Sequence, residues 1–576
     1  MKFKYIALVL SCFTLLACND DFLEQVPKDE LSLATPWTQN LMEQYSNEYY
    51  KDIKGHTTGW GFGKDKSYIF EDEQSDNMAR ANYDLVAAGL HSVPDTKGGW
   101  GHVDNWKQLR RCNFFLEGVV NSPEGDVVKN HYAGLAHFWR AWFYFKKVKK
   151  FGDVTFFTKA VTIADDDILY GPRTPRKDVM DSVLVDLNFA CEHIKDGDTK
   201  ANDYINRFTA LALKARICLH EGTFRKYHGL GDHEIFLQEA RDAALELIES
   251  GKYALYQSGD QPYNELFRTE DMLANSELIL IKRYETGVHG HSRLRYRNGD
   301  TGLTKDMVDD YLNADGTHYD GSFDDDIEQE LANRDPRLLQ TIYWAPEGGV
   351  WTYSKGSTPW PVPMLSGSKY NGKAVQKWNL TTTGYHLSLS FDAEYFNASN
   401  MDAPIFRYAE VLLAYAEACA ELGECTQEVI DNSINKLRQR VGMTEMTIAG
   451  LLPEPADRND YALLLPSKRP EVLLEEIRRE RRVELACQGF RYDDLMRWKL
   501  GQFLVKPVRG MRLATGTPNE SFKTSKTKVD ANGYLAPYLG GAGETDRTFN
   551  ELKHYLLPIP LESLSENLLL EQNPEW

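Results

Sequence analysis

Residues 127–153 read VVKNHYAGLAHFWRAWFYFKKVKKFGD, and this stretch decides the class of fold. Its apolar side chains recur at every third or fourth position, which places them on one stripe of a helix. The residues of this stripe are Leu135, Phe138, Trp142 and Phe145. Gly152 ends the pattern, as glycine often does at a helix C-terminus. The stretch therefore predicts a long amphipathic helix that packs against other helices.

Five further segments carry the same helical spacing of apolar residues. They are residues 176–194, 207–222, 235–253, 405–424 and 471–498. Glycines predict where three of these helices end, at Gly222, Gly251 and Gly423. The pattern predicts a mostly α fold in which tetratricopeptide-like helical pairs form a scaffold, although no clean repeat period can be counted.

The stretch between the two helical blocks differs in composition. Residues 286–402 are rich in Gly, Tyr, Trp and turn residues, as in YWAPEGGVWTYSKGSTPWPVP. They predict a long loop-rich insertion that contains short strands, and residues 501–576 predict C-terminal loops. Long structured loops on a helical scaffold are a usual place for binding residues.

The first residues predict a signal peptide that ends at a lipidated cysteine. Lys2 and Lys4 are followed by a mostly apolar run at 5–17, which is too short to span a bilayer as a permanent helix. The run closes with Leu-Leu-Ala before Cys18, a sequence similar to the bacterial lipobox. Residues 1–17 would then be removed and Cys18 would carry the lipid anchor. No later segment has the apolar length of a membrane helix, so we expect a soluble body tethered by its N-terminus.

The overall charge restricts the class of ligand. The chain of 576 residues has a formal net charge of -19, with 42% hydrophobic and 26% charged residues. The shares of hydrophobic and charged residues are those of an ordinary globular protein. The negative net charge argues against a nucleic-acid-binding protein, which needs a basic face. The negative net charge is compatible with neutral ligands.

The cysteines after Cys18 show no CxxC pair and no zinc spacing, and four lie in helical patterns where buried free thiols are expected. These four are Cys191, Cys218, Cys419 and Cys487.

Several motifs, in order along the chain, resemble those of the SusD-like (SusD/RagB) family of outer-membrane nutrient-binding lipoproteins. They are CNDDFLEQVP at 18–27, FWRAWFYFKKVKKFGDV at 138–154, TKDMVDDYLNADG at 304–316, NRDPRL at 333–338, IFRYAEVLLAYAEA at 405–418, RRERRVELACQGFRYDDLMRW at 478–498 and YLLPIPLESLSENLLLEQNPEW at 555–576. The chain ends in Asn-Pro-Glu-Trp where the family has Asn-Pro-Gly-Tyr, which affects only the final turn.

The resemblance implies a fold, a function and a partner. It implies one SusD-like domain over residues 18–576, with the helical scaffold mainly at 105–285 and 403–500. It implies a surface-exposed, glycan-binding lipoprotein of the outer membrane that captures oligosaccharides and delivers them to a TonB-dependent SusC-like transporter. Asp20 and Asp21, just after the lipidated cysteine, resemble the family's signal for export to the cell surface. Three alternatives stay open: the same scaffold binding peptides or another non-sugar nutrient, a surface glycosidase, and a structural adaptor that holds a transporter complex together without touching substrate.

Aromatic residues in predicted loops are the candidate ligand contacts. Aromatic residues of loops and helices together make up 12% of the chain. Their flat rings can stack on the apolar faces of sugars. In the family, glycan sites are made from an early loop region and the central loops together. We therefore predict as ligand-binding residues Asp76, Arg80, Trp100, Tyr296, Trp344, Trp351 and Trp360. Trp106 resembles a helix-packing tryptophan of the family and is left out.

The motif at 478–498 is predicted to be structural. Glu475 would face Arg479 at i,i+4 on one helix, and the next turn would be tied to the helical body. The residues expected to tie it are Arg491, Asp493, Asp494 and Arg497.

The sequence contains no pattern that demands catalysis. It has no GxSxG, no HExxH and no P-loop, and with 85 acidic residues a pair such as Glu71 and Asp72 carries no information. His289 and His291 lack a third ligand, and no acidic loop fits the EF-hand template. We therefore expect a binding protein without enzyme activity, cofactor or metal ligands.

Overall fold

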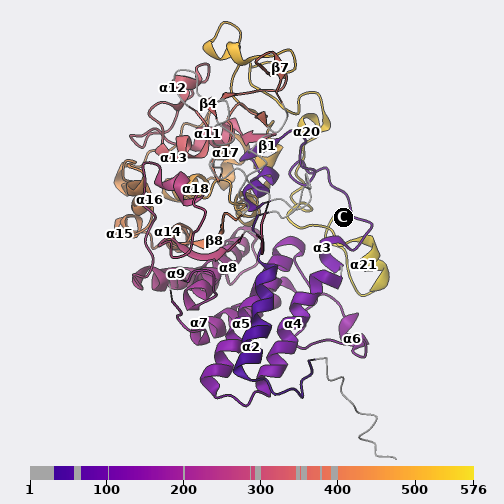
Figure 1. Cartoon of the computed structure of the whole chain (residues 1–576). Coiled ribbons are helices and arrows are strands. Elements are labelled where there is room, and N and C mark those ends of the chain that lie inside the picture. The colour runs from indigo at the N-terminus through magenta and orange to yellow at the C-terminus, as the bar shows by residue number, and fades with distance from the viewer. Residues whose placement is uncertain are drawn as a thin grey trace, which may run out of the picture.

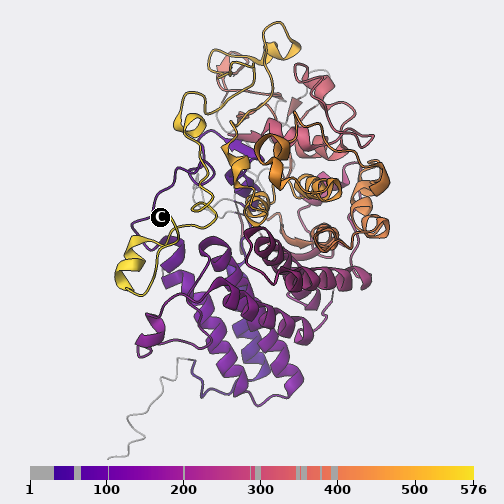
Figure 2. The same cartoon turned by 180° about the vertical axis from the view of Figure 1, so that it is seen from behind.

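The computed structural model of the chain describes residues 31–56, 67–101, 103–198, 201–285, 287–291, 300–344, 350–351, 360–375, 379–390 and 400–576. Helices predominate, and strands are few and short. Figures 1 and 2 show two lobes, of which the lower is built from the helices of the N-terminal half. We call the part made by residues 39–47 and 98–249 the helical lobe, and the part made by the described residues of 68–80, 262–407 and 510–545 the loop-rich lobe.

The helical lobe is a stack in which each long helix packs on the next. Its helices are α2 (Gln39–Asn47), α3 (Gly98–Gly101), α4 (Val103–Val120), α5 (Asp126–Phe151), α6 (Asp166–Leu169), α7 (Arg176–His193), α8 (Arg207–His228) and α9 (His233–Glu249). Contacts run from α4 to α5, then through α7, α8 and α9 to α14 of the second helical block. The predicted mostly α fold of packed helical pairs is confirmed.

Helix α5 is the central member of this stack. Phe138 and Trp139 are buried within it, and Gly152 ends it with a φ of 71°, as its sequence predicts. Asp126 in the first turn and lysines in the last turn suit the helix dipole. The apolar stripe therefore determines both where the helix lies and where it ends.

The predicted end of α8 at Gly222 is wrong, because the helix continues to His228 and stops at Gly229, whose φ is 71°. A Cβ atom on Gly222 would lie 2.8 Å from the side chain of Leu237 on α9. This glycine permits close packing of two helices instead of ending one. The other two predicted ends are confirmed: α9 stops within two residues of Gly251, and α14 stops at Gly423.

The second helical block covers one side of the stack and separates it from the loops. Its helices are α14 (Tyr408–Leu422), α15 (Gln427–Asp431), α16 (Ile434–Arg440), α17 (Asp460–Leu464), α18 (Val472–Glu484) and α19 (Arg491–Arg497). Two short helices near the C-terminus, α20 (Ala542–Thr545) and α21 (Leu561–Glu566), lie apart from this block (Figure 1). α18 packs on α14, although eight of its thirteen residues are charged and those eight are buried. The predicted pair of Glu475 and Arg479 is wrong, because Glu475 pairs with Arg469 at 3.0 Å.

The loop-rich lobe contains short elements joined by turns. They are α10 (Pro262–Leu266), α11 (Lys305–Asp310), α12 (Ile327–Leu331), α13 (Pro336–Thr341), β1 (Met78–Arg80), β2 (Leu278–Lys282), β3 (Thr301–Leu303), β4 (Val350–Trp351), β5 (Trp360–Pro361), β6 (Lys369–Tyr370), β7 (Lys373–Ala374) and β8 (Ala403–Arg407). The strands form antiparallel pairs β1–β3, β2–β8, β4–β5 and β6–β7. Separate apolar cores lie under the two lobes.

Two sequence expectations concern single chemical features. The four cysteines predicted as buried thiols are buried, and none of them forms a disulfide with another described residue. Among the described residues, no helix has the length and apolar character needed to cross a membrane.

Candidate functional site

One cavity of the helical lobe combines aromatic and polar side chains. It has a volume of about 450 Å³ and lies where α3, α4, α6 and α21 gather on one side of the molecule (Figure 1). Trp100 from α3 and Trp106 from α4 line it, together with Phe157 and Tyr170. We call this cavity the tryptophan pocket.

Helix α4 presents several lining residues of the pocket on one face. Trp106, Arg110 and Asn113 are spaced by four and three positions, so they follow one another along the helix surface. The buried Asn113 donates from Nδ2 to the carbonyl oxygens of Phe157 and Lys159, each at 3.0 Å. These bonds hold the segment after α5 in place as a second wall.

The two tryptophans are fixed by polar contacts behind the pocket. The indole N–H of Trp106 donates to the carbonyl oxygen of Trp100 at 2.8 Å, and the rings meet edge to face at 6.2 Å. Lys147 Nζ donates to the carbonyls of Gly99 and Trp100 at 2.7 and 2.8 Å and lies 4.8 Å from the centre of the Trp106 ring. Burial lowers the pKa of Lys147 to about 7. The aromatic surface is therefore preorganised, with Trp100 3% exposed and Trp106 half-buried.

The rim of the pocket carries charged side chains. Lys97 pairs with Glu566 of α21 at 2.5 Å, which joins the C-terminal segment to the start of α3. Lys159 pairs with Asp165 at 2.5 Å across the loop that precedes α6. A few large apolar surfaces combined with a small set of placed polar groups are typical of small-molecule sites.

A second cavity, of about 440 Å³, lies beside α18 and is lined mostly by charged residues. These side chains bind one another. Arg482 lies 2.5 Å from Asp310 and 3.0 Å from Asp306, and Arg479 lies 2.6 Å from Glu454. We call this space the charged cavity. We interpret it as part of an ion-pair network and not as a ligand site, because its acidic and basic side chains pair with one another.

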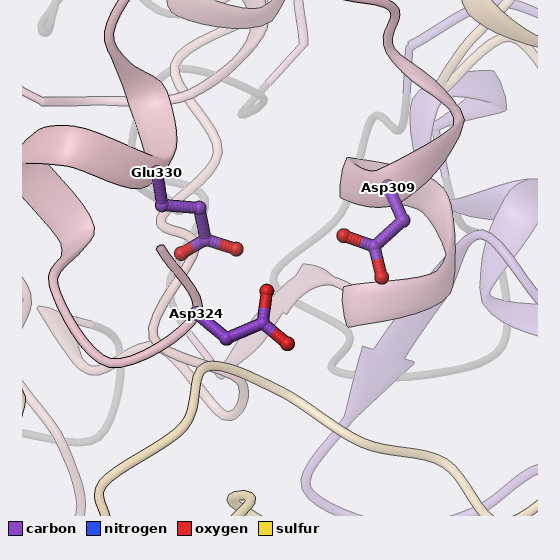
Figure 3. A group of neighbouring side chains, drawn as sticks. All are labelled: Asp309, Asp324 and Glu330. Carbon is purple, nitrogen blue, oxygen red and sulfur yellow. The ribbon is translucent and has the colours of Figure 1, made fainter. Parts of the chain in front are cut away.

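Three carboxylates next to the charged cavity have the spacing of a metal site. Figure 3 shows Asp309, Asp324 and Glu330 converging from three segments, with one oxygen of each within 4.8 Å of the others. The ammonium group of Lys305 pairs with all three, at 2.8 Å from Asp324, at 3.2 Å from Glu330 and in a hydrogen bond with Asp309. Although burial opposes it, these carboxylates hold the pKa of Lys305 above its usual value. Lys305 therefore supplies the positive charge that a cation would supply.

The predicted contacts in the early loop region lie in the other lobe. Asp76 is buried, and Arg491 and Arg482 lie 2.7 and 3.1 Å from its carboxylate. Although burial opposes it, these two guanidinium groups hold the pKa of Asp76 well below its usual range. Arg80, in β1, lies 3.5 Å from Glu73. Asp76 and Trp100 line different cavities.

The predicted central aromatics are only partly described. Trp344 is half-buried against the core of the loop-rich lobe. The Cα atoms of Trp351 and Trp360 are register partners in the antiparallel β4–β5 pair. Tyr296 and Cys18 lie outside the described residues. The participation of these residues in ligand binding stays a prediction.

Sequence reasoning selected Trp100 but missed most of the pocket around it. The sequence predicts Trp106 as a packing residue, and the predicted ligand contacts do not include Arg110, Phe157 or Tyr170. The spacing of Trp106, Arg110 and Asn113 on one helix face was a readable signal, although it did not reveal which segment lies opposite.

Known proteins are similar to this chain over most of its length. Residues 291–576 match the SusD family. A SusD-like protein of Formosa agariphila is 24% identical over 534 residues, which cover 88% of this chain and 94% of the relative. A SusD-like protein of Bacteroides ovatus is 22% identical and covers 100% of this chain and 98% of the relative.

Solved structures share the fold. A SusD-like carbohydrate-binding protein from Bacteroides fragilis superposes with a TM-score of 0.73 at 22% identity, covering 92% of this chain and 99% of that one. Surface glycan-binding protein A from Bacteroides fluxus has a TM-score of 0.57 at 17% identity, covering 93% and 99%.

Proposed function

The chain is a member of the SusD-like family, and on this premise we propose that it is a surface-exposed, glycan-binding lipoprotein. It captures oligosaccharides at the outer membrane and delivers them to a TonB-dependent SusC-like transporter. Two structural neighbours named for carbohydrate or glycan binding support this proposal.

The tryptophan pocket is the observation that supports glycan capture best. Sugar rings present apolar C–H faces to aromatic side chains, while their hydroxyl groups need polar partners. Trp106, Phe157 and Tyr170 offer rings, and Lys97 and Arg110 offer donors at the rim. The ring of Trp106 is held in place before a ligand arrives, so little ordering entropy of this side chain opposes binding.

A glycan array tests this function with protein that lacks only the signal peptide and lipid. We expect the wild type to bind a restricted set of glycans, and Trp106→Ala to weaken that binding about tenfold or more through the lost ring contact. Trp142→Ala is the matched control, because Trp142 is a half-buried tryptophan that packs on Trp139 and Phe406 away from the pocket.

Three results would replace the proposal. Binding to peptides and not to glycans would assign the scaffold to another nutrient. New reducing ends from a polysaccharide panel would indicate a glycosidase. Equal glycan binding by wild type and Trp106→Ala would move the site out of the tryptophan pocket and towards the predicted contacts Arg80 and Trp351.

Anchoring and delivery are tested in cells. Replacing the lipid-accepting thiol in Cys18→Ser should release the protein from outer-membrane fractions and remove its labelling by a fatty-acid analogue. The native protein should co-purify from detergent-solubilised outer membranes with a TonB-dependent transporter. Recovery of the lipidated protein without any such transporter would contradict the delivery step.

A further inference from the structure

We propose that the tryptophan pocket selects acidic glycans, with a carboxylate or sulfate group of the sugar bound at Arg110. This inference rests on the proposed glycan-binding function and adds the charge of the ligand to it. Charged lining residues of the pocket are Lys97, Lys107, Arg110 and Lys159 on the basic side and Glu566 on the acidic side. Basic side chains therefore outnumber acidic ones in the pocket lining, on a chain whose formal net charge is -19.

Lys97 and Lys159 have carboxylate partners at the rim. Lys97 pairs with Glu566, whose side chain is 50% exposed, and Lys159 is 48% exposed where it pairs with Asp165. Ion pairs this exposed are weak, so either lysine can exchange its partner for a ligand group at little cost.

Arg110 is the residue best suited to hold an anionic substituent. It is exposed at the pocket, and its Nε donates only a long hydrogen bond, 3.4 Å, to the carbonyl oxygen of Val161. Among the residues that the structure describes, no carboxylate pairs with Arg110. A guanidinium group presents paired donors that match a carboxylate or a sulfate, which makes it a better selector than a lysine at the same place.

The position of Arg110 relative to the rings fits one sugar residue. Arg110 follows Trp106 by four positions on α4, so the two side chains start about 5–6 Å apart on the same face. A pyranose ring stacked against the indole would therefore bring its charged substituent to the guanidinium group. A neutral glycan would leave this donor pair to water.

The acidic surface of the protein does not cancel this preference. Repulsion between exposed charges is largely screened beyond about 8 Å at physiological ionic strength. Contacts inside a half-enclosed pocket are screened much less, so the local charge decides the affinity.

Matched pairs of oligosaccharides test the inference directly. The probes are tetragalacturonate with its carboxyl-reduced form, and a κ-carrageenan tetrasaccharide with its desulfated form. By calorimetry we expect the wild type to bind at least one acidic probe about tenfold more tightly than its neutral partner. The pair that shows the preference distinguishes a carboxylate ligand from a sulfate ligand. Raising NaCl from about 50 to about 500 mM should reduce the ratio of the two affinities.

Variants then locate the selectivity. Arg110→Gln should bring the ratio of acidic to neutral affinity close to one. Arg241→Gln should keep the wild-type ratio, because Arg241 lies on α9 and pairs with Glu424. Equal affinity of the wild type for acidic and neutral partners, or an unchanged ratio in Arg110→Gln, overturns the inference and leaves glycan binding intact. Absence of binding to every probe and to a broad array of acidic and neutral glycans overturns the proposed function and this inference with it.

Discussion

Helices α5 and α18 are both buried, but different interactions hold them. α5 inserts Phe138, Trp139 and other apolar side chains into the core of the helical lobe. α18 buries arginines and glutamates that pair with segments far away in the sequence. Apolar contacts are non-directional and tolerate exchange, whereas a buried charge must keep its partner. The comparison predicts that α5 is robust to conservative change and that α18 is not.

Glu484 should show this sensitivity most strongly. Its carboxylate is fully buried and accepts from Arg337, Arg407 and Arg440, at 3.0, 2.7 and 2.7 Å. Glu484→Gln keeps the shape but leaves these guanidinium groups without their common anion. We expect the free energy of unfolding to fall by about 4 kcal/mol, measured by urea denaturation. Glu48→Gln, which breaks an exposed pair with Lys51, is the control and should change it by less than about 0.5 kcal/mol.

Acid should weaken the same contacts without a mutation. Although burial opposes it, the three arginines lower the pKa of Glu484 from 4.5 to about 2. The unfolded state then binds the proton first, so the contribution of Glu484 is complete above pH 4.5 and is lost as the pH falls towards 2. The shift corresponds to about 3 kcal/mol. The free energy of unfolding should fall over this range in the wild type and fall less steeply in Glu484→Gln, and parallel curves would contradict the assignment.

Lys305 offers a third test, because its ammonium group takes the place of a cation. Lys305→Ala removes the ammonium group shared by Asp309, Asp324 and Glu330 and leaves Arg458, 3.4 Å from Asp309, as a cation still paired with this cluster. Burial already raises the pKa of Glu330 to about 7. Protonation of Glu330 limits the damage, so we expect a loss of about 2 kcal/mol. Millimolar Ca²⁺ should raise the thermal midpoint of this variant and leave the wild type unchanged. If Ca²⁺ does not change the thermal midpoint of this variant, the three carboxylates do not form a set of metal ligands.

The two helices also differ in how far their sequences predict them. The apolar stripe of α5 and its end at Gly152 follow from residues within one segment, and both are confirmed. The partners of α18 cannot be read in this way, because Glu484 and Arg337 are 147 residues apart. Local spacing therefore suggested the pair of Glu475 and Arg479, which does not form.

The candidate site likewise contains residues that local sequence spacing predicts and residues that only long-range packing brings together. Helix periodicity puts Trp106, Arg110 and Asn113 on one face, and these residues could have been selected from the sequence. The opposite walls come from the segment after α5 and from residues near the C-terminus. Long-range packing brings these segments together, and a single sequence does not show it. Trp100 was selected for a site with Asp76, yet the two residues line different cavities.

Phe138→Leu gives the smallest effect and completes the comparison. Phe138 is fully buried in α5, and its ring lies 5.5 Å from that of Trp139 and 5.7 Å from that of Trp142. Leucine keeps most of the apolar surface and favours the helix, so the neighbours can repack around it. We expect the free energy of unfolding to fall by about 1 kcal/mol, a quarter of the loss in Glu484→Gln, in the same denaturation experiment. If Phe138→Leu costs as much as Glu484→Gln, the core of α5 is as specific as the ion pairs of α18, and directional contacts do not distinguish the two helices.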